Sequence, residues 1–497
     1  MLLETLLSQI HGVALRGDPK IPIAAVAYDS RNVSPGALFV AIKGQKTSGE
    51  LFIDDAVNRG AAAVATESIA AEDTRVPFMI VPDARRFLAE AARLFWKDPA
   101  RELKLVAVTG TNGKTTTTYL VEAILRQAGL KPCVIGTLGT QIGDRRFPGE
   151  RTTPEATDLT RLLRQAVDGG CTCGALEVSS HALALQRVYG MKFTAGVFTN
   201  LTPDHLDFHG DMESYFRAKS LLFSSAGANE IETAVLNADD PYAMRLAARR
   251  SWPIITFGFG ERADVRVLRM ALSLDATEVK LATPAGNLDT TLRLAGRPNV
   301  CNAMAAAAAA LSLGIGVPEV ERGLHSLEGV PGRMEAVRAG QPFSVLVDYA
   351  HTPDALEKLL ETVCALPHKR VITVFGCGGD RDRTKRPLMG AVAVRLSDLV
   401  IATSDNPRSE DPLAIIEHIR VGLDGGPGAY EVSPDRRKAI VRAFSLAEPG
   451  DVVVIAGKGH ETYQILGSKV LPFDDREVAR DALARLQRRT VGGTKAP

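Results

Sequence analysis

LKLVAVTGTNGKTTTT, residues 103–118, combines an apolar run, a Gly-rich loop with Lys114 and Thr115, and the beginning of a helix-like segment. Residues 103–108 have the apolar, β-branched character of a buried strand, and residues 116–129 repeat apolar side chains at helical spacing before a terminal glycine. A loop between such a strand and such a helix points its backbone N–H groups and the positive end of the helix at a bound anion. Lys114 would add a positive charge, and the Thr115 hydroxyl could bind Mg2+. The stretch therefore predicts a phosphate site, which we interpret as a site for ATP.

The loop departs from the usual phosphate-loop pattern at one position. That pattern has glycine where Val108 stands, so only the core GTNGKTT, residues 110–116, agrees with it. The competing interpretation is a Gly-rich turn that carries a lysine by chance. The flanking strand and helix favour the phosphate site over such a turn.

Length and composition are those of an ordinary globular chain with several domains. The 497 residues exceed one usual core and predict about three domains. A formal net charge of +1 gives no global field that would attract nucleic acid or an acidic membrane. The apolar runs are too short to span a bilayer, and the N-terminus lacks the features of a signal peptide. We expect a cytoplasmic monomer with reduced cysteines, no nucleic-acid partner and no membrane insertion.

The alternation of strand-like and helical segments predicts three α/β units, residues 1–99, 100–330 and 331–497. The first alternates strand-like segments at 23–30, 36–44, 61–66 and 77–83 with helical ones. The second alternates apolar strands with helices, as in a parallel sheet covered on both faces, and includes a strong helix former at 302–313. Gly329–Gly332 marks the beginning of the third unit.

The third unit contains four apolar runs that each end in a polar cluster. They read SVLVDYAHT, VITVFGCGGDRD, DLVIATSDNPR and DVVVIAGKGHE. Ligands of parallel α/β sheets bind outside the carboxyl ends of the strands, so these clusters should meet at one edge. One such cluster would be an ordinary turn, whereas four favour a binding edge. Arg381, Arg408 and Glu461 in these clusters suggest a zwitterionic substrate such as an amino acid.

Several side chains of the second unit are compatible with metal or anion binding. Glu177 closes a strand-like run and is equally compatible with Mg2+ binding and with a solvent-facing or capping role. Residues 199–209 hold two His and two Asp, which suggests metal or phosphate contacts but not a self-contained metal site. Lys219 lies among apolar residues on a predicted helix, and by itself this pattern favours a surface lysine.

Hydroxyls and a guanidinium suited to an anionic substrate occur at residues 151–154, at 179–181 and at Arg187. Helix capping is the competing role for the serines and threonines. In the third unit, Asp348 ends a strand and could bind a ribose.

Taken together and in order, the motifs resemble the ATP-dependent Mur ligases of peptidoglycan synthesis. They are GTNGKTT, EVSSH, TNLTPDHLDFHG, NVCNAMAA, PGRME, VDYAHTPDA, GCGGDRDRTKRP, DNPR and GKGHE, and they run from about residue 29 to residue 461. Within that family the chain is most similar to the tripeptide-synthetase (MurE) branch. In that branch, DNPR is typical of enzymes that add meso-diaminopimelate rather than lysine.

The resemblance implies an N-terminal UDP-binding α/β domain, a central phosphate-loop domain with a parallel sheet, and a C-terminal Rossmann-like domain for the amino acid. It implies an ATP-dependent amide ligase that adds meso-diaminopimelate to UDP-N-acetylmuramoyl-L-alanyl-D-glutamate through an acyl phosphate, with Mg2+ as cofactor.

The resemblance also implies roles for individual residues. ATP would be bound by Gly110, Thr111, Asn112, Gly113, Lys114, Thr115, Thr116, Asn302, Arg333 and Asp348. Metal would be held by Thr115, Glu177, His205 and Lys219 (as a carbamate), and Lys114, Lys219, His205 and Glu177 would be catalytic. The UDP-linked dipeptide would contact Tyr28, Ser30, Gln45, Lys46, Thr47, Thr152, Thr153, Ser179 and Arg187. Diaminopimelate would contact Arg381, Asp405, Asn406, Pro407, Arg408, Gly457 and Glu461.

Two points stay open at the level of sequence. Some relatives carry a substrate-contacting Gln where this chain has Leu185, and Gln186 follows it. The base that deprotonates the attacking amine could be His351, His205 or solvent.

Three other functions compete with this assignment. A folylpolyglutamate synthetase-like ligase is disfavoured by the separate N-terminal unit and by DNPR. A phosphate-loop switch or motor would leave the polar strand ends of the third unit without a role. A non-catalytic UDP-sugar-binding protein would leave the ATP loop without one.

Overall fold

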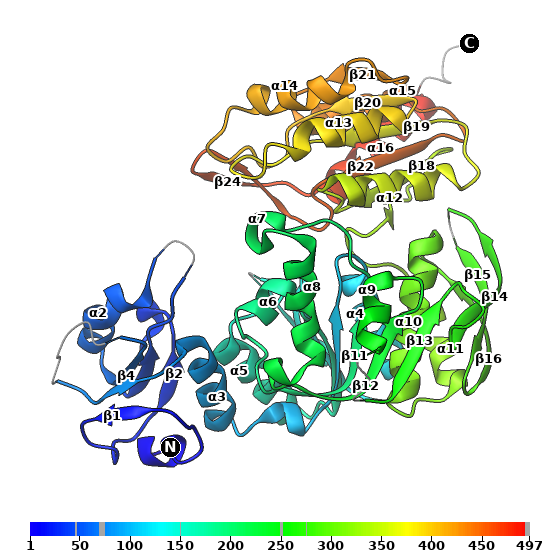
Figure 1. The fold of residues 1–497 in the computed structure, drawn as a ribbon. Helices are drawn as coiled ribbons and strands as arrows, with labels where there is room; N and C mark the ends of the chain where they lie inside the picture. The colour runs from blue at the N-terminus through cyan, green and yellow to red at the C-terminus, as the bar shows by residue number, and fades with distance from the viewer. Residues whose placement is uncertain (45–46, 69–74, 150, 249–251, 275, 493–497) are drawn as a thin grey trace, which may run out of the picture.

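The computed structural model describes residues 1–44, 47–68, 75–149, 151–248, 252–274 and 276–492. In these residues a five-stranded, an eleven-stranded and a six-stranded sheet follow one another along the chain, and a two-stranded hairpin lies near the end. Helices pack against each large sheet (Figure 1). The mixed α/β architecture expected from the alternation of strands and helices is confirmed.

The N-terminal unit is built on a sheet of order β1–β5–β4–β3–β2, in which only β1 runs antiparallel to its neighbour. Its strands are β1 (Ala14–Arg16), β2 (Ala25–Ala27), β3 (Ala37–Val40), β4 (Ala61–Thr66) and β5 (Phe78–Ile80), and its helices are α1 (Leu3–Leu7), α2 (Ile53–Asn58) and α3 (Ala84–Phe95). All four predicted strands are present. Asp83 caps α3 by accepting the backbone N–H groups of Arg85 and Arg86.

The central sheet has the order β16–β15–β14–β13–β12–β11–β6–β10–β7–β8–β9. Its strands are β6 (Lys104–Thr109), β7 (Pro132–Gly136), β8 (Gly139–Ile142), β9 (Arg145–Phe147), β10 (Cys173–Glu177), β11 (Lys192–Phe198), β12 (Glu230–Asn237), β13 (Ile254–Gly258), β14 (Val265–Leu272), β15 (Thr277–Thr283) and β16 (Gly286–Leu292). The seven central strands β7, β10, β6, β11, β12, β13 and β14 are parallel to one another, whereas β8 and β9 at one margin and β15 and β16 at the other are added by antiparallel pairing. The predicted parallel sheet is therefore correct for its centre only.

The helices of the central unit cover both faces of this sheet. They are α4 (Lys114–Gln127), α5 (Ala156–Asp168), α6 (Ser180–Ala184), α7 (Leu206–His209), α8 (Met212–Ser220), α9 (Pro241–Ala247), α10 (Arg297–Ser312) and α11 (Val317–Ser326). The predicted strand and helix around the Gly-rich loop are β6 and α4. The alanine-rich α10 is buried against α4, because its small side chains permit a close approach.

The C-terminal sheet has the order β17–β18–β22–β19–β20–β21 and is parallel except for β17. Its strands are β17 (Glu335–Ala336), β18 (Ser344–Asp348), β19 (Val371–Phe375), β20 (Leu399–Ala402), β21 (Ala429–Val432) and β22 (Val452–Ala456), and its helices are α12 (Pro353–Cys364), α13 (Lys385–Arg395), α14 (Pro412–Leu423), α15 (Arg436–Leu446) and α16 (Asp475–Gly492). The four strands with polar ends, β18, β22, β19 and β20, are direct neighbours. The predicted meeting of these ends at one edge is confirmed.

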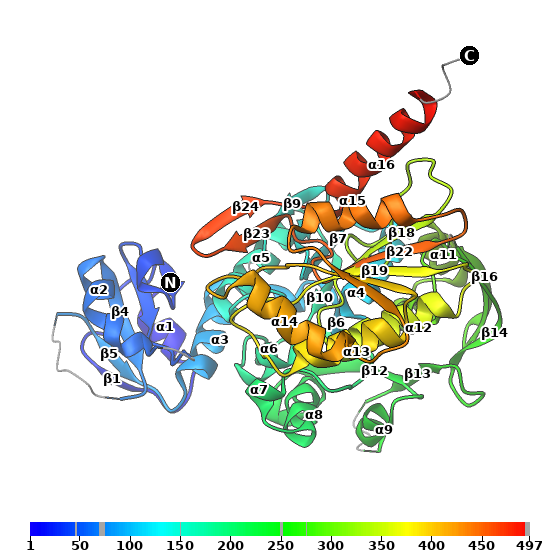
Figure 2. The same ribbon diagram turned by 90° about the horizontal axis from the view of Figure 1, so that it is seen from above.

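The C-terminal unit lies over the carboxyl ends of the central strands, and the N-terminal unit lies to one side next to α5 (Figures 1 and 2). The hairpin of β23 (Tyr463–Leu466) and β24 (Lys469–Pro472) extends from the C-terminal unit in the direction of the N-terminal one (Figure 2). The central and C-terminal units face each other across the phosphate loop, and this contact positions the candidate site.

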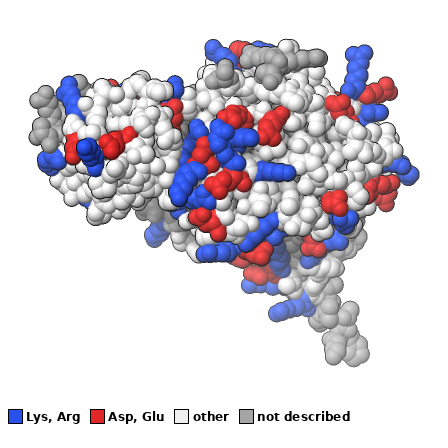
Figure 3. All heavy atoms as spheres, turned by 90° about the horizontal axis from the view of Figure 1, so that it is seen from below, with Lys and Arg blue, Asp and Glu red and all other residues white. Residues whose placement is uncertain are grey.

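The surface mixes charges of both signs. Basic and acidic side chains are interspersed on the face shown in Figure 3. In the part of the chain that the structure describes, no helix is both long and apolar enough to cross a membrane. Cys133, Cys171, Cys173 and Cys377 are buried free thiols, whereas Cys364 is exposed.

Candidate active site

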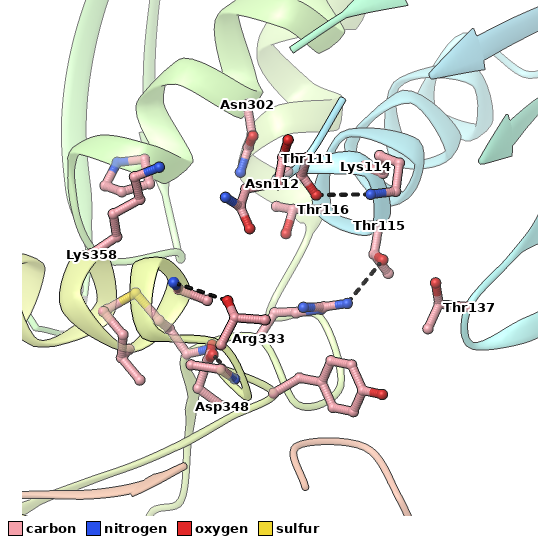
Figure 4. A pocket seen from close by; sticks show the side chains of 18 of the residues that line it. Thr111, Asn112, Lys114, Thr115, Thr116, Thr137, Asn302, Arg333, Asp348 and Lys358 are labelled. Carbon is pink, nitrogen blue, oxygen red and sulfur yellow. Dashed lines mark hydrogen bonds between the residues drawn. The ribbon is translucent and has the colours of Figure 1, made fainter. Parts of the chain in front are cut away.

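A cavity of about 330 Å3 lies between the phosphate loop and the C-terminal unit. Its walls include nine of the ten residues predicted to bind ATP: Thr111, Asn112, Gly113, Lys114, Thr115, Thr116, Asn302, Arg333 and Asp348. Glu177 and His205 also line it. Figure 4 shows the loop on one side and Arg333 pointing toward it from the other. Residues that are far apart in sequence thus line one cavity.

The phosphate loop needs glycine at two positions. Gly110 has a φ of +151°, and a Cβ there would lie 1.9 Å from the Thr199 hydroxyl oxygen. Gly113 has a φ of +87°, and a Cβ there would lie 2.3 Å from Asn302 Oδ1. Any side chain would therefore push the loop away from its neighbours. Because Gly113 directly precedes α4, the helix begins with its free N–H groups facing the cavity.

Lys114 and Lys219 meet at the loop. The ammonium of Lys114 donates to the carbonyl oxygen of Gly110 at 3.0 Å, and that of Lys219 donates to the same oxygen at 2.8 Å. Lys219 is only 1% exposed and lies 4.6 Å from the centre of the Tyr215 ring. Burial and the charge of Lys114 hold the pKa of Lys219 well below its usual value. The interpretation of Lys219 as a surface lysine is wrong, because α8 turns this side chain onto the phosphate loop.

Glu177 is 1% exposed and is held by threonines. Its carboxylate accepts hydrogen bonds from the Thr115 hydroxyl at 3.0 Å, the Thr137 N–H at 2.8 Å and the Thr137 hydroxyl at 3.0 Å. The solvent-facing alternative for Glu177 is therefore wrong. Thr115 also accepts a hydrogen bond from Arg333 Nη2 at 3.3 Å, which links the loop to the C-terminal unit. This oxygen-rich corner fits the ligand preference of Mg2+.

His205 lies in a group of aromatic rings at the cavity wall. Its ring centre is 4.8 Å from that of His181, and its Nε2 is 3.5 Å from Asp204 Oδ2. Burial lowers the pKa of His205, and it lowers the pKa of His181 and of His209 to about 4, so neutral imidazoles are favoured. Among the described residues, no three His, Cys, Asp or Glu side chains are arranged to hold a metal ion by themselves. A metal here would need further ligands.

Asp348 and Arg333 form the opposite wall. Asp348 accepts the N–H groups of Met334 at 2.7 Å and Ala350 at 2.8 Å, and desolvation raises its pKa. The Arg333 guanidinium lies 5.0 Å from the centre of the Tyr349 ring. These contacts hold an anionic and a cationic side chain at the far side of the cavity from the phosphate loop.

A second group, of hydroxyls and a guanidinium, adjoins Glu177. Thr153 donates to the Glu177 carbonyl oxygen at 2.8 Å and accepts the Ser179 N–H at 3.1 Å, and Arg187 Nη1 donates to the Thr153 carbonyl oxygen at 3.0 Å. The Thr152 and Thr137 hydroxyl oxygens are 3.1 Å apart. Ser179 also caps α6, so the capping role considered for it is real. The four predicted residues of the second unit thus lie together.

Sequence reasoning missed Glu155 in this group. Glu155 is 5% exposed and pairs with Arg187 at 2.8 Å and with Arg151 at 2.7 Å. Arg85 from α3 lies 3.6 Å from the same carboxylate. Arg151 is four residues away, but Arg85 and Arg187 come from distant segments, so the sequence alone does not show that three arginines surround Glu155.

The other residues predicted to contact the UDP-linked substrate belong to the N-terminal unit. The Tyr28 hydroxyl donates to Asp158 Oδ2 on α5 at 3.0 Å and so ties this unit to the central one. Ser30 is buried in the turn that follows β2, and Thr47 lies in the loop after β3. Gln45 and Lys46 lie outside the described residues.

Gln186 has a contact of its own at the junction of the two units. Its φ is +57°, and its side-chain nitrogen donates to Asp83 Oδ2 at 2.5 Å. Asp83 is the residue that caps α3. Gln186 therefore joins α3 to the central unit.

At the carboxyl edge of the C-terminal sheet, Lys458 lies at the centre of the predicted amino-acid residues. It is 0% exposed, and its ammonium is 3.0 Å from Glu461 Oε2, 3.2 Å from Asn406 Oδ1 and 3.6 Å from Asp405 Oδ1. Asn406 donates to Glu461 at 2.8 Å. Gly457 (φ +112°) passes so close to Asp405 that a Cβ there would lie 2.9 Å from its carboxylate. Lys458 was not predicted as a site residue, although its motif GKGHE was noted.

The two predicted arginines lie beside this group. A Cβ at Gly378 would be 3.0 Å from Arg408 Nη1 and 3.8 Å from Arg381 Cγ, which places both side chains around one glycine. Arg408 Nη1 donates to the Gly379 carbonyl oxygen at 2.7 Å. Pro407 packs its carbonyl against Gly379. Cationic and anionic groups thus meet at one edge, as recognition of a zwitterion requires.

His351 is one of the groups considered as the base for the amine. It lines the cavity, and its Nδ1 is 2.9 Å from the Tyr349 carbonyl oxygen. Desolvation lowers its pKa, so the neutral form that could accept a proton is favoured. His205 shares this property, and the geometry does not separate the two.

Comparison with known proteins gives the same outline. The family model "Mur ligase family, catalytic domain" matches residues 22–96, "Mur ligase middle domain" matches residues 108–310, and "Mur ligase, glutamate ligase domain" matches residues 332–459. These matches run in order along nearly the whole chain.

Individual relatives are similar over their full length. A protein of Geobacillus thermodenitrificans named UDP-N-acetylmuramoyl-L-alanyl-D-glutamate--2,6-diaminopimelate ligase is 47% identical over 487 residues, 97% of this chain and 99% of that protein. A solved structure with the same protein name is 33% identical, with a TM-score of 0.70 over 98% of this chain and 99% of that one. The MurF ligase of Thermotoga maritima, solved with ADP, shares the fold at 20% identity and a TM-score of 0.61, over 95% of this chain and 98% of that one. The chain belongs to the Mur ligase family.

Proposed function

We propose that this protein is the ATP-dependent ligase that joins meso-diaminopimelate to UDP-N-acetylmuramoyl-L-alanyl-D-glutamate in peptidoglycan precursor synthesis. The observation that carries the proposal is the cavity in which the phosphate loop faces Arg333 and Asp348 of the C-terminal unit. The substrate pair is the one in the name of the Geobacillus thermodenitrificans relative. DNPR at 405–408 supports meso-diaminopimelate as the amino acid.

The nucleotide would lie with its phosphates on residues 110–116 and its ribose toward Asp348. Lys114 would place its charge on the transferred phosphate, and Arg333 would hold the nucleotide from the C-terminal side, with Asn302 beside Gly113. Such fixed positive groups stabilise the charge that spreads over the phosphoryl oxygens in the transition state.

The reaction would proceed in two steps. The D-Glu γ-carboxylate attacks the γ-phosphorus of ATP in line, so that a carboxyl–phosphate bond forms and ADP leaves. An amine of diaminopimelate then attacks the acyl carbonyl, loses a proton, and expels phosphate to leave an amide. His351, His205 or solvent would accept that proton.

The residues around the loop fit Mg2+ and a carbamate on Lys219. Thr115 and Glu177 would hold one ion, and His205 and Lys219 a second; when bound, Mg2+ neutralises phosphate charge. The lowered pKa of Lys219 supports the modification, because carbon dioxide adds to a neutral amine with release of one proton. The carbamate would add an anionic oxygen on this side of the loop, in addition to the Asp204 carboxylate beside His205.

The UDP-linked dipeptide would extend from the N-terminal unit to the loop. Its contacts would be Tyr28, Ser30, Gln45, Lys46, Thr47, Thr152, Thr153, Ser179 and Arg187. The hydrogen bond from Thr153 to the Glu177 carbonyl supports this path, because it joins a residue proposed to contact the dipeptide to a residue proposed to bind metal.

Diaminopimelate would bind at the C-terminal edge through Arg381, Asp405, Asn406, Pro407, Arg408, Gly457 and Glu461. We assign residues 1–99 to the UDP substrate, 100–330 to ATP and 331–497 to the amino acid. The enzyme would act in the cytoplasm as a monomer on these small molecules.

The test measures ADP and phosphate release with UDP-N-acetylmuramoyl-L-alanyl-D-glutamate and ATP, in parallel with meso-diaminopimelate, lysine or no amino acid. We expect release that depends on diaminopimelate, with a product heavier by one residue in mass spectrometry. Equal release without an amino acid would favour a phosphate-loop switch and overturn the proposal. A preference for lysine would overturn the assigned substrate.

A further inference from the structure

Two loops of the C-terminal unit interlock at the binding edge. The β19 loop (residues 376–384) carries Arg381, and the β20 loop (residues 403–411) carries Arg408. The Gly379 N–H donates to the Asn406 carbonyl oxygen at 2.9 Å. A Cβ at Gly379 would lie 1.8 Å from the Pro407 carbonyl oxygen, so the two backbones are in direct contact.

Glu410 connects the two loops through its carboxylate. Its carboxylate accepts the Asp380 N–H at 2.7 Å and two hydrogen bonds from Arg386, from Nη2 at 2.8 Å and from Nη1 at 3.1 Å. Arg383 pairs with it at 3.1 Å. Both carboxylate oxygens are therefore engaged by protein groups, which leaves Glu410 as a support rather than a ligand for substrate.

The β19 loop also accepts hydrogen bonds from the β20 loop. Asp380, on the β19 loop, accepts the Ser409 hydroxyl at 2.6 Å and the Ser409 N–H at 3.3 Å. Arg386 is 0% exposed and also donates to the Gly378 carbonyl oxygen at 3.3 Å. Each loop thus supplies both a carboxylate and a donor to the other.

The backbone of both loops needs such support. Asp380 and Arg408 both have a φ of +53°, the left-handed region that residues with a side chain rarely adopt. A backbone in this region is retained only where contacts with the surrounding residues offset its conformational cost. Arg381 directly follows Asp380, so the conformation that Glu410 holds also sets the direction of the Arg381 side chain.

We propose that Glu410 and Arg386 are positioning residues that fix the separation of Arg381 and Arg408, and thereby the selectivity for a diamino dicarboxylic acid over an amino acid with one carboxylate. The inference rests on the proposed function, in which these two arginines bind the amino acid. Meso-diaminopimelate differs from lysine by the second carboxylate, so only diaminopimelate gains from two guanidinium groups held at a fixed spacing.

The test is Glu410→Gln, which keeps an oxygen for the Asp380 N–H but places an amide against Arg386. We expect the KM for meso-diaminopimelate to rise about tenfold or more, with kcat at saturation and the KM for ATP within about twofold of wild type. The preference for diaminopimelate over lysine in kcat/KM should fall by a similar factor, because lysine lacks the second carboxylate.

Glu431→Gln is the matched control. Glu431 accepts two hydrogen bonds from Arg442, at 2.9 and 2.8 Å, in an exposed pair of the same unit outside the two loops. Its kinetics should equal those of wild type. Ser409→Ala removes one reciprocal hydrogen bond at an exposed position, so it tests the inference even if Glu410→Gln does not fold; its KM should shift in the same direction by less.

Three results are decisive. An unchanged KM for diaminopimelate and an unchanged preference over lysine in both loop variants would overturn the inference. A fall in kcat together with equal rises in the KM of all three substrates would mean that the pair only stabilises the fold, which also overturns it. Absence of diaminopimelate-dependent turnover in the wild type would instead contradict the proposed function.

Discussion

Lys114 and Lys219 donate to one and the same acceptor, the carbonyl oxygen of Gly110, at 3.0 and 2.8 Å. Two ammonium groups at one carbonyl repel each other; Lys219 is buried, whereas Lys114 is half-buried at the cavity wall. Desolvation lowers the pKa of both lysines, and the positive charge of Lys114 lowers the pKa of Lys219 further. The charge of Lys114 therefore favours the neutral form of Lys219, which is the form that the proposed carbamate requires.

Replacing Lys219 should show whether its amine has a chemical role or whether its side chain only fills space in the core. Lys219→Met keeps the length of the side chain but removes the amine, and we expect turnover to fall by about two to three orders of magnitude. ADP release measures the effect, and circular dichroism checks the fold. Lys192→Met, at a half-exposed lysine of β11 paired with Glu232, is the control and should stay active. Turnover near the wild-type rate in Lys219→Met would contradict the proposed carbamate.

Lys114→Ala should act chiefly on phosphoryl transfer. Removing a charge that stabilises the transferred phosphate costs roughly 3–4 kcal/mol, a loss of about 100- to 1000-fold in kcat. The expected loss appears in single-turnover formation of ADP, while the KM for diaminopimelate changes little because that site is on another unit. Activity close to normal would refute the role of Lys114.

Arg408→Ala tests whether the Arg408 side chain recognises the second carboxylate of meso-diaminopimelate. The guanidinium lies beside Gly378 with Arg381, and we expect the preference for meso-diaminopimelate over lysine to fall by about tenfold or more. Competition between the two amino acids in one assay measures this ratio directly. If the variant keeps the same preference, the assignment of Arg408 is wrong.

Asp354 connects the C-terminal unit to the phosphate loop. Its Oδ2 accepts hydrogen bonds from Asn112 at 3.1 Å, Thr202 at 2.9 Å and Lys358 at 2.9 Å. Asp354→Ala should loosen the contact between α12 and the loop and lower kcat about tenfold, equivalent to about 1.4 kcal/mol.

The control for Asp354 is Glu357→Ala on the same helix. Glu357 pairs with Arg395 at the surface, so its loss should leave kcat unchanged. Thermal unfolding should be similar in both variants. Equal kcat values in the two variants would show that the Asp354 contact has no part in catalysis.

The free energy of unfolding at low pH should depend on the hydrogen bonds that the Glu410 carboxylate accepts. The hydrogen bonds from Arg386 and Asp380 lower the pKa of Glu410 from 4.5 to about 2. A carboxylate whose pKa is lower in the folded state stabilises the protein above its unfolded pKa and loses this contribution as the pH falls toward the folded value. The difference in unfolding free energy between wild type and Glu410→Gln should therefore shrink from pH 5 to pH 2, measured by urea unfolding. A difference that stays constant with pH would contradict this account.

Much of the fold could be predicted from local patterns. The strand and helix around GTNGKTT, four of the five strands of the N-terminal sheet and the four polar strand ends of the C-terminal sheet all lie where their sequence periodicity predicts them. These features depend on residues that are close together in the sequence, so their patterns can be recognised without the tertiary structure. The antiparallel margins of the central sheet were missed, because pairing direction depends on connections rather than on periodicity.

The candidate site was less accessible to sequence reasoning. Lys219 looked like a surface lysine until its resemblance to the family was considered, and only packing of α8 on the loop shows its burial. Glu155 carries no local signal that separates it from ordinary charged residues, and Lys458 stands out only as part of the motif GKGHE. Each is joined to the site by a partner from a distant segment, Arg187 for Glu155 and Asp405 for Lys458.

By itself the sequence determined the α/β units, the phosphate loop and the order of the family motifs, because periodicity, glycine positions and motif residues are local properties of the chain. The tertiary structure alone decided that Lys114 and Lys219 share one carbonyl, that Glu410 locks the loops of Arg381 and Arg408, and that Asp354 reaches the phosphate loop. Those relationships join residues that are far apart in sequence. They form only when the sheets pack and the strand ends meet, and the free energy of that packing is a property of the whole fold.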